Sequence, residues 1–159
     1  MNEQAMRSIV ETVVEQMKAP KDITLKAALE LAEKVKEKAR QMGVKAVVAI
    51  SNRAANPVLV ECMDDSYIAS YDIAVQKAFT VVSLKMPTSQ LKELAQPGGE
   101  LYGIQFTNNG KIVIFGGGEP LTAPDGTIIG GIGVSGGSEA QDTALASYGK
   151  EIFEKGYKL

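Results

Sequence analysis

Glycines with the spacing of a dinucleotide-binding turn, Gly131-x-Gly133-x-x-Gly136, stand in the stretch IIGGIGVSGGSEAQD. A dinucleotide-binding fold also requires a second parallel strand after the next helix and an acidic residue about twenty positions on. The downstream sequence predicts neither, and no glycine cluster is followed by the Lys-Ser or Lys-Thr of a phosphate loop. We therefore expect the first glycines to let a strand pass closely under a helix. The amides of Gly136, Gly137 and Ser138, at a predicted helix N-terminus, could still hold a carboxylate or phosphate.

Histidine is absent from the chain. Zinc hydrolases, Ser-His-Asp triads and His-ligated haem all depend on imidazole, so these classes lose their central residue. Cys62 is the single cysteine, which excludes an internal disulfide, and its apolar neighbours favour a packing role. No carboxylate pair, activated nucleophile or metal cluster stands out, so we expect a binding or accessory protein rather than an enzyme.

The overall charge argues against two classes of partner. The formal net charge is -2, whereas nucleic acid or an anionic membrane surface would require a basic field. No run approaches the roughly eighteen apolar residues of a membrane span. Glu3, Arg7 and Glu11 also interrupt the apolar centre that a signal peptide would need, so we expect a cytoplasmic protein with no nucleic-acid or membrane partner.

The chain divides into two parts, residues 1–19 and residues 20–159. Pro20 predicts a break between them. The first part is a short amphipathic helix, and its apolar face, the predicted partner-binding face, consists of Ile9, Val10, Val13, Val14 and Met17.

The second part predicts an α+β domain with an antiparallel sheet, because its strands follow one another through tight turns. A helix capped by Thr24 precedes a strand hairpin, and two further helices, a second hairpin around Asn108-Asn109-Gly110, a glycine loop, a strand and a last helix follow. The last helix begins at the S-x-x-Q capping box of Ser138. The predicted ranges are 25–42, 44–51, 57–63, 66–84, 88–96, 102–115 for the second hairpin, 127–134, and 138 to about 155.

Four ordered blocks resemble one known family. GGGEPL and GTIIGGIGVSGGSEAQD look like the signature of the GlcG/HbpS family, which also forms the C-terminal domain of some diol-utilisation-type cobalamin adenosyltransferases. ITLKAALELAEKVKEKARQMG resembles its opening helix and SYDIAVQKAFTVVSLKMPTSQL its central helix. The resemblance implies a profilin-like five-stranded antiparallel sheet with helices on both faces, assembled into a homo-oligomer. Some members bind haem, and others have a proposed role with corrinoids or small metabolites.

The resemblance also implies a ligand cleft. It would lie between the glycine loop, the glycine turn and the central helix, with these residues: Asp72, Lys77, Gly116, Gly117, Gly118, Pro120, Gly136, Gly137, Ser138 and Asp142. Lys77 could counter a ligand carboxylate or propionate. An equally supported alternative is that Asp72 and Lys77 form solvated or intersubunit salt bridges.

The cofactor stays open at this point. Haem-binding relatives have an axial histidine, which this sequence cannot supply. Tyr67, Tyr71, Cys62 or a methionine could in chemical principle ligate iron, although each is more simply a packing residue. The adenosyltransferase activity belongs to a different domain and is not carried over.

Two functional classes remain. The first is an accessory protein that binds a small molecule or a haem- or corrinoid-like tetrapyrrole; the second is an oligomeric structural or interaction protein without a ligand, with an enzyme of small-acid metabolism as a weaker alternative. The helix over residues 6–17 resembles targeting helices of bacterial microcompartments for diol or glycerol metabolism, and would then bind a shell or cargo protein. The alternative is a helix docked on its own domain or on an oligomer partner.

Overall fold

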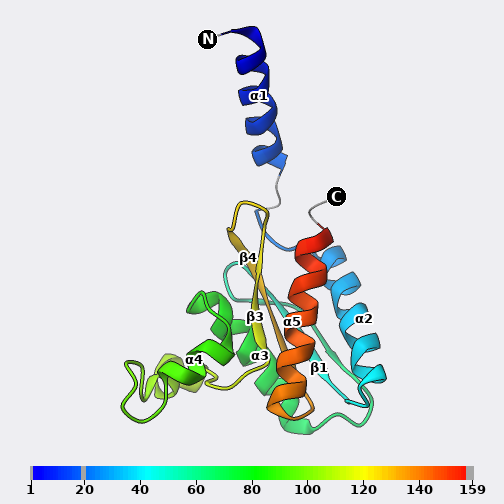
Figure 1. Ribbon diagram of the computed structural model, residues 1–159. Coiled ribbons are helices and arrows are strands. Elements are labelled where there is room, and N and C mark those ends of the chain that lie inside the picture. Colours follow the sequence, from blue (N-terminus) through cyan, green and yellow to red (C-terminus); the bar gives the residue numbers. More distant parts are fainter. Residues whose placement is uncertain (1, 19–20, 157–159) are drawn as a thin grey trace.

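The computed structural model describes residues 2–18 and 21–156, and for residues 15–18 it describes the backbone alone. Helices and strands combine in an α+β fold, as the sequence predicts (Figure 1). The helices are α1 (Glu3–Lys18), α2 (Leu25–Gln41), α3 (Ile68–Ser83), α4 (Thr88–Leu94) and α5 (Glu139–Gly156). The strands are β1 (Val47–Asn52), β2 (Pro57–Cys62), β3 (Gly118–Thr122) and β4 (Ile128–Ser135).

The strands form one antiparallel sheet in the order β2-β1-β4-β3. The β1–β2 hairpin confirms the first predicted hairpin, with Val48 opposite Glu61 and Ile50 opposite Leu59. Over the described residues the sheet has four strands, so the expected five-stranded, profilin-like sheet is wrong in its strand count.

The second predicted hairpin, over residues 102–115, is also wrong. This segment contains two short 3-10 turns, Ile104–Phe106 and Asn108–Gly110, and no strand. Asn108 and Asn109 do have the positive φ that the turn signal indicated, 51° and 57°. The backbone after them is held by α3 instead of a partner strand, because the Val113 N–H donates to Thr80 Oγ1 at 3.0 Å.

Part of the expected glycine loop is a strand. Residues 118–122 form β3, which pairs with β4 and places Pro120 opposite Gly131. Proline has no N–H to give to a second neighbour, so it is tolerated here because β3 lies at the edge of the sheet.

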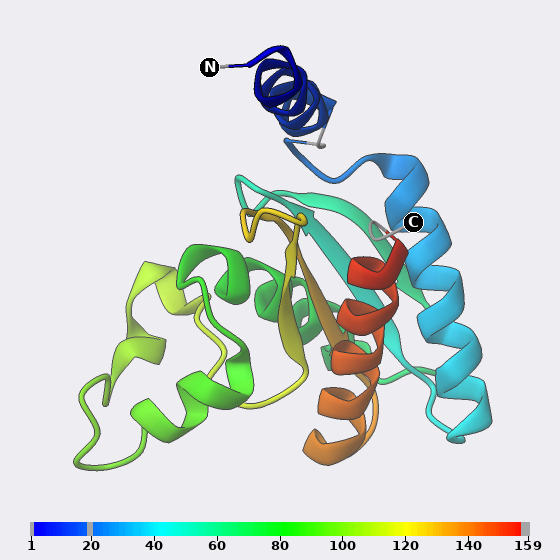
Figure 2. The same cartoon turned by 45° about the horizontal axis from the view of Figure 1, so that its top comes forward.

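Helices cover both faces of the sheet. Residues of β1 alternate between the faces: Val48 and Ile50 pack in the core beneath α2 and α5, and Val47 and Ala49 pack against α3. Figure 2 shows α2 and α5 side by side on one face, with α3 behind the strands on the other. This two-sided cover explains the continuous apolar run of β1.

The first glycines of the signature lie directly under α3. A Cβ atom at Gly133 would stand 2.1 Å from Ala74 O, and one at Gly131 would stand 2.6 Å from Val81 Cγ2. Any larger residue would push β4 away from the helix. Close strand–helix packing therefore accounts for the spacing that resembled a nucleotide turn.

Helix α1 confirms the predicted N-terminal helix and stands apart from the domain in both views (Figures 1 and 2). The side chains of its apolar face, Ile9, Val10, Val13 and Val14, are 40–56% exposed. The Met17 side chain lies outside the described residues. Within the described ranges, no helix combines the length and apolar character needed to cross a membrane.

Candidate functional site

A buried ion pair joins α3 to the start of α5. Lys77 is fully buried, and its Nζ donates to Asp142 Oδ2 at 3.1 Å and to Val134 O at 2.7 Å. The Phe115 ring centroid lies 5.0 Å from the same nitrogen. Burial lowers the pKa of Lys77, and the charges of Asp142 and Glu139 partly offset this effect. The alternative of a solvated or intersubunit salt bridge is therefore corrected for Lys77, because its partner lies in the same chain and both side chains are buried.

The glycine turn before α5 is held by side chains of the helix itself. The Gly137 N–H donates to Asp142 Oδ1 at 2.8 Å. The Ser138 N–H donates to Gln141 Oε1 at 2.9 Å, and the Gln141 N–H returns a bond to Ser138 Oγ at 3.2 Å, which confirms the predicted capping box. An anion that used these two amides would first have to displace Asp142 and Gln141.

The glycine loop packs onto the ion pair. Gly117 has φ +112°, and a Cβ atom there would stand 2.5 Å from Lys77 Nζ. The Gly116 N–H donates to Glu139 Oε1 at 2.9 Å, and the Gly118 N–H donates to Thr88 Oγ1 at 2.9 Å. These bonds fix the loop between α4 and the first turn of α5.

Glu139 completes this arrangement from the first turn of α5. It accepts a 2.6 Å hydrogen bond from Lys92 Nζ, and this bond, together with the one from the Gly116 N–H, lowers the pKa of its carboxyl. A carboxylate at this position also faces the positive end of the helix dipole.

Two pockets flank the glycine turn. The first, here the turn pocket, has a volume of about 260 Å³ and lies beside the ion pair; its lining is Tyr67, Ala69, Ser70, Ile73, Phe115, Ser135, Gly136, Gly137, Glu139 and Asp142. The second, here the polar pocket, has a volume of about 540 Å³; its lining is Gly43, Val44, Lys45, Asp65, Tyr67, Gly136, Gly137, Ser138 and Gln141. Tyr67, Gly136 and Gly137 line both pockets, so the glycine turn lies between them.

The structure brings most of the predicted site residues together. Lys77, the three glycines of the loop, the turn from Gly136 to Ser138, and Asp142 all lie in the ion pair or around it. Asp72 is not among them, because it is exposed on α3 and accepts a 2.7 Å bond from Gln76 Nε2. Pro120 lies further along β3, where its carbonyl accepts a 3.2 Å bond from Lys150 Nζ, and it lines neither pocket.

Sequence reasoning missed several side chains of the turn pocket. Ser70 and Ser135 are buried and joined by a 3.0 Å hydrogen bond between their hydroxyls, and Ile73 and Phe115 supply its apolar wall. The sequence pattern predicts that Ile73 lies in a helix, but it does not predict that its side chain lines a pocket. The pairing of the two serines depends on contacts 65 residues apart, for which a single sequence carries no signal.

Three candidate iron ligands are not the packing residues that we expected. Tyr67, the residue before α3, is 71% exposed, and Tyr71 in the first turn of α3 is 54% exposed. Cys62 is also exposed, at the end of the edge strand β2. Among the described residues, no group of three or more His, Cys, Asp or Glu side chains is arranged to hold a metal ion.

Comparison with known proteins places this geometry in a family. The chain is 41% identical over 133 residues to an uncharacterized 15.0 kDa protein of the dhaT-dhaS intergenic region of Citrobacter freundii, covering 84% of this chain and 93% of that protein. It is also 41% identical over 110 residues to the corrinoid adenosyltransferase PduO of Salmonella typhimurium, covering 69% of this chain but only 32% of that enzyme.

Two solved structures share the fold. Klebsiella pneumoniae protein ORFY matches with a TM-score of 0.80 at 40% identity, over 82% of this chain and 90% of that one. The PduOC:heme complex matches with a TM-score of 0.78 at 35% identity, over 82% of this chain and 94% of that one. The family model described as haem degrading protein HbpS-like matches residues 23–151. The chain therefore belongs to the HbpS-like family, as its sequence blocks indicated.

Proposed function

We propose that this protein is a non-catalytic accessory protein that binds a haem- or corrinoid-like tetrapyrrole at the turn pocket. The observation that carries the proposal is that the turn pocket has an apolar and aromatic opening next to a buried ion pair. Ile73 and Phe115 line the pocket, Tyr67 stands exposed at its mouth, and the buried Lys77–Asp142 pair fixes the turn behind it. The similarity to a heme complex at 35% identity supports the same ligand class.

The size of the pocket decides how such a ligand would bind. Sites that enclose a drug-sized ligand measure about 300–1,000 Å³, and the turn pocket measures about 260 Å³. It would therefore admit one edge of a macrocycle and leave the rest against Tyr67, Ile68 and Tyr71, which are exposed beside it. A bound tetrapyrrole would supply metal-centred redox or ligand-exchange chemistry.

The available donors fit iron through oxygen rather than through imidazole. The Tyr67 phenol lines the pocket, and tyrosine is a known haem ligand. Cys62 lines a different groove together with Lys36 and Arg40. Lys77 is enclosed and paired with a buried carboxylate, so we assign the contact with a ligand carboxylate to Lys45 of the polar pocket. Lys45 is exposed, and a ligand would replace its 3.0 Å ion pair with the exposed Asp65.

Titration of the purified protein with haemin and with cobalamin tests the proposal. A saturable Soret or corrinoid absorbance change with a rise in melting temperature is expected, because a ligand selective for the folded state stabilises it. Phe115→Ser should weaken binding, whereas Phe106→Ser, at an 83% exposed phenylalanine in the loop over residues 102–115, should not. A protein that responds to neither ligand would contradict the proposal and favour the alternative, an oligomeric interaction protein without a small ligand.

A second candidate function concerns α1. Its exposed apolar face, and relatives that include PduO and a dhaT-dhaS region protein, support a cytoplasmic protein that α1 directs into a bacterial microcompartment by binding a shell or cargo protein. The pair Val10→Asp and Val13→Asp should abolish co-localisation of a fluorescent fusion with shell protein. The matched pair Ser8→Asp and Thr12→Asp, which adds the same charge to the polar face, should preserve it. Unchanged localisation of the valine variants would refute targeting.

A homo-oligomer is part of the same proposal. Ile68 is 96% exposed between Tyr67 and Tyr71, and contiguous exposed apolar side chains of this kind mark interaction surfaces. Ile68→Lys should reduce the mass measured by light scattering. An unchanged mass would place the interface elsewhere.

A further inference from the structure

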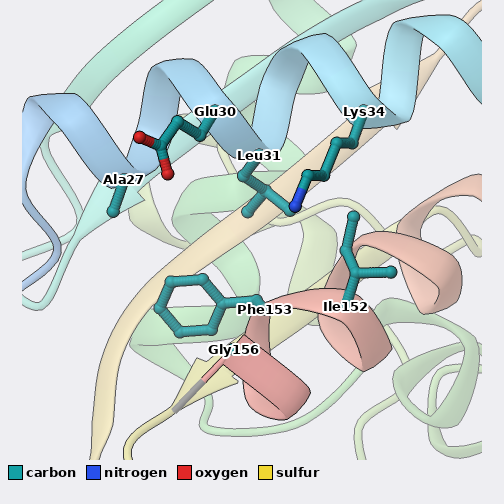
Figure 3. A pocket seen from close by; sticks show the side chains of 7 residues that line it. All are labelled: Ala27, Glu30, Leu31, Lys34, Ile152, Phe153 and Gly156. Carbon is teal, nitrogen blue, oxygen red and sulfur yellow. The ribbon is translucent and has the colours of Figure 1, made fainter. Parts of the chain in front are cut away.

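A second hollow lies away from the turn, between the outer helices α2 and α5. This α2–α5 groove has a volume of about 240 Å³. Its lining is Ala27, Glu30, Leu31 and Lys34 of α2 and Ile152, Phe153 and Gly156 of α5. Figure 3 shows Leu31 facing Phe153 and Ile152, with the carboxylate of Glu30 and the ammonium of Lys34 on the α2 side. The groove thus has an apolar floor and one rim with both charges.

The groove follows about two turns of α2, since its lining residues on that helix run from Ala27 to Lys34. A hollow of this kind can hold part of the apolar face of an amphipathic helix.

Helix α1 has the complementary features. Its face of Ile9, Val10, Val13 and Val14 is exposed, and these residues are spaced to follow one side of a helix. Arg7 precedes Val10 by three residues and Glu3 precedes Arg7 by four, so these charges border the same face.

The charges match when the two helices are antiparallel. Glu30 and Lys34 are four residues apart on α2, as Glu3 and Arg7 are on α1. In this direction Arg7 meets Glu30 while Glu3 meets Lys34.

The domain start is fixed in place close to α1. The Ile23 N–H donates to Ile129 O at 3.0 Å, and the Arg53 N–H donates to Asp22 Oδ1 at 2.9 Å. From this anchor α1 extends away from the groove of its own chain (Figures 1 and 2). A helix of 16 residues is about 24 Å long and so reaches well beyond the domain.

We propose that the α2–α5 groove binds α1 of a second copy of this chain, so that two copies exchange their N-terminal helices about a two-fold axis. This contact is independent of tetrapyrrole binding. It uses the face of α1 that would bind a shell protein, so the two partners would compete for it.

A charge-swap experiment on the full chain, without shell protein, tests the exchange. Copy A carries Glu30→Lys and Lys34→Glu in the groove; copy B carries Glu3→Arg and Arg7→Glu on α1. The measurement is hydrogen exchange of the α1 amides. We expect exchange about tenfold faster in A alone and in B alone than in the unchanged protein, which corresponds to about 1.4 kcal/mol of lost protection. The mixture of A and B should regain protection, because each copy then meets a matching partner only in the other.

The remaining outcomes overturn the proposal. If the mixture stays unprotected while one chain carrying all four changes is protected, α1 docks on its own domain. If all the samples exchange alike, the groove does not bind α1. Melting temperatures of A and B equal to that of the unchanged protein would show that the changes act on docking and not on the fold, since all four residues are exposed.

Discussion

Removal of the Asp142 charge gives a direct measure of what the buried ion pair does. Asp142→Asn keeps the shape of the side chain and an oxygen for the Gly137 N–H, but it leaves Lys77 buried with Val134 O as its remaining strong acceptor. Breaking a buried pair from one side costs about 3–5 kcal/mol. This loss of unfolding free energy has an upper limit, because the buried Lys77 can lose its proton and become neutral. At pH 7 this costs at most about 5 kcal/mol, since each pH unit below the ordinary pKa of 10.5 costs about 1.4 kcal/mol.

The sign of the pH dependence follows from the same proton. Asp142 raises the pKa of Lys77 against the effect of burial, so the variant should hold this lysine neutral when folded and charged when unfolded. The unfolded state then binds one more proton, and the free energy of unfolding rises with pH by up to about 1.4 kcal/mol per unit between pH 7 and pH 9. The free energy of unfolding of the unchanged protein should rise less over this range, because its folded state keeps more of the positive charge on Lys77.

Urea unfolding followed by far-UV circular dichroism measures these quantities. The double variant Lys77→Met with Asp142→Asn should lose less than the sum of the two single variants, because no charge is then left unpaired. The control is the exposed pair Lys92–Glu139, whose side chains are 41% and 36% exposed, and for which Lys92→Met should cost about 1 kcal/mol or less. If Asp142→Asn costs no more than this control and shows no alkaline recovery, Lys77 is hydrated and the reasoning is wrong.

Three further changes probe the frame around the pair. Gly117→Ala should cost more than about 2 kcal/mol by thermal or urea unfolding, because φ is +112° and the new Cβ would meet Lys77 Nζ; Gly126→Ala, with φ +84° and open space around it, should cost about 1 kcal/mol. Thr88→Val should cost about 1–3 kcal/mol, because it leaves a buried N–H of β3 without its acceptor, and a smaller loss would indicate that water replaces the hydroxyl. Burial raises the pKa of Glu119, so the folded state retains this proton longer than the unfolded one and loses stability as the pH rises from about 4.5 through the raised pKa; Glu119→Gln should lack this loss, and parallel pH profiles of the two proteins would contradict it.

The elements with strong local signals could be predicted from the sequence. Thr24 caps α2 through a 3.1 Å bond from the Ala27 N–H, and Ser138 caps α5, as their residue types indicate. The strand-like pattern over residues 102–115 predicted a hairpin wrongly, because this segment packs against α3 and not against a second strand. Thr80 and Phe79 of α3 hold this segment, through the bond to the Val113 N–H and through Lys111 over the Phe79 ring. Tertiary contacts of this kind override a local pattern.

The candidate site shows a different limit of prediction from the sequence. Lys77 and Asp142 were both expected at the site, yet their contact was not, because it joins residues 65 positions apart. The expectation that Lys77 faces a ligand came from the family resemblance and from its charge. Its complete burial under Gly117 reverses that expectation, since only a glycine leaves room for the ammonium group beside the loop.

The signature residues and the residues at the pocket mouth therefore have separable roles. The glycines of the loop and turn, Lys77 and Asp142 contact one another, and their hydrogen-bonding groups are largely used within the chain. They form one wall of the turn pocket. Under the proposed function, ligand choice would depend on side chains that reach the opening without contacting Lys77 or Asp142, namely Tyr67 and Ile73. Changes in the wall should alter stability and binding together, whereas changes at the mouth should alter binding alone.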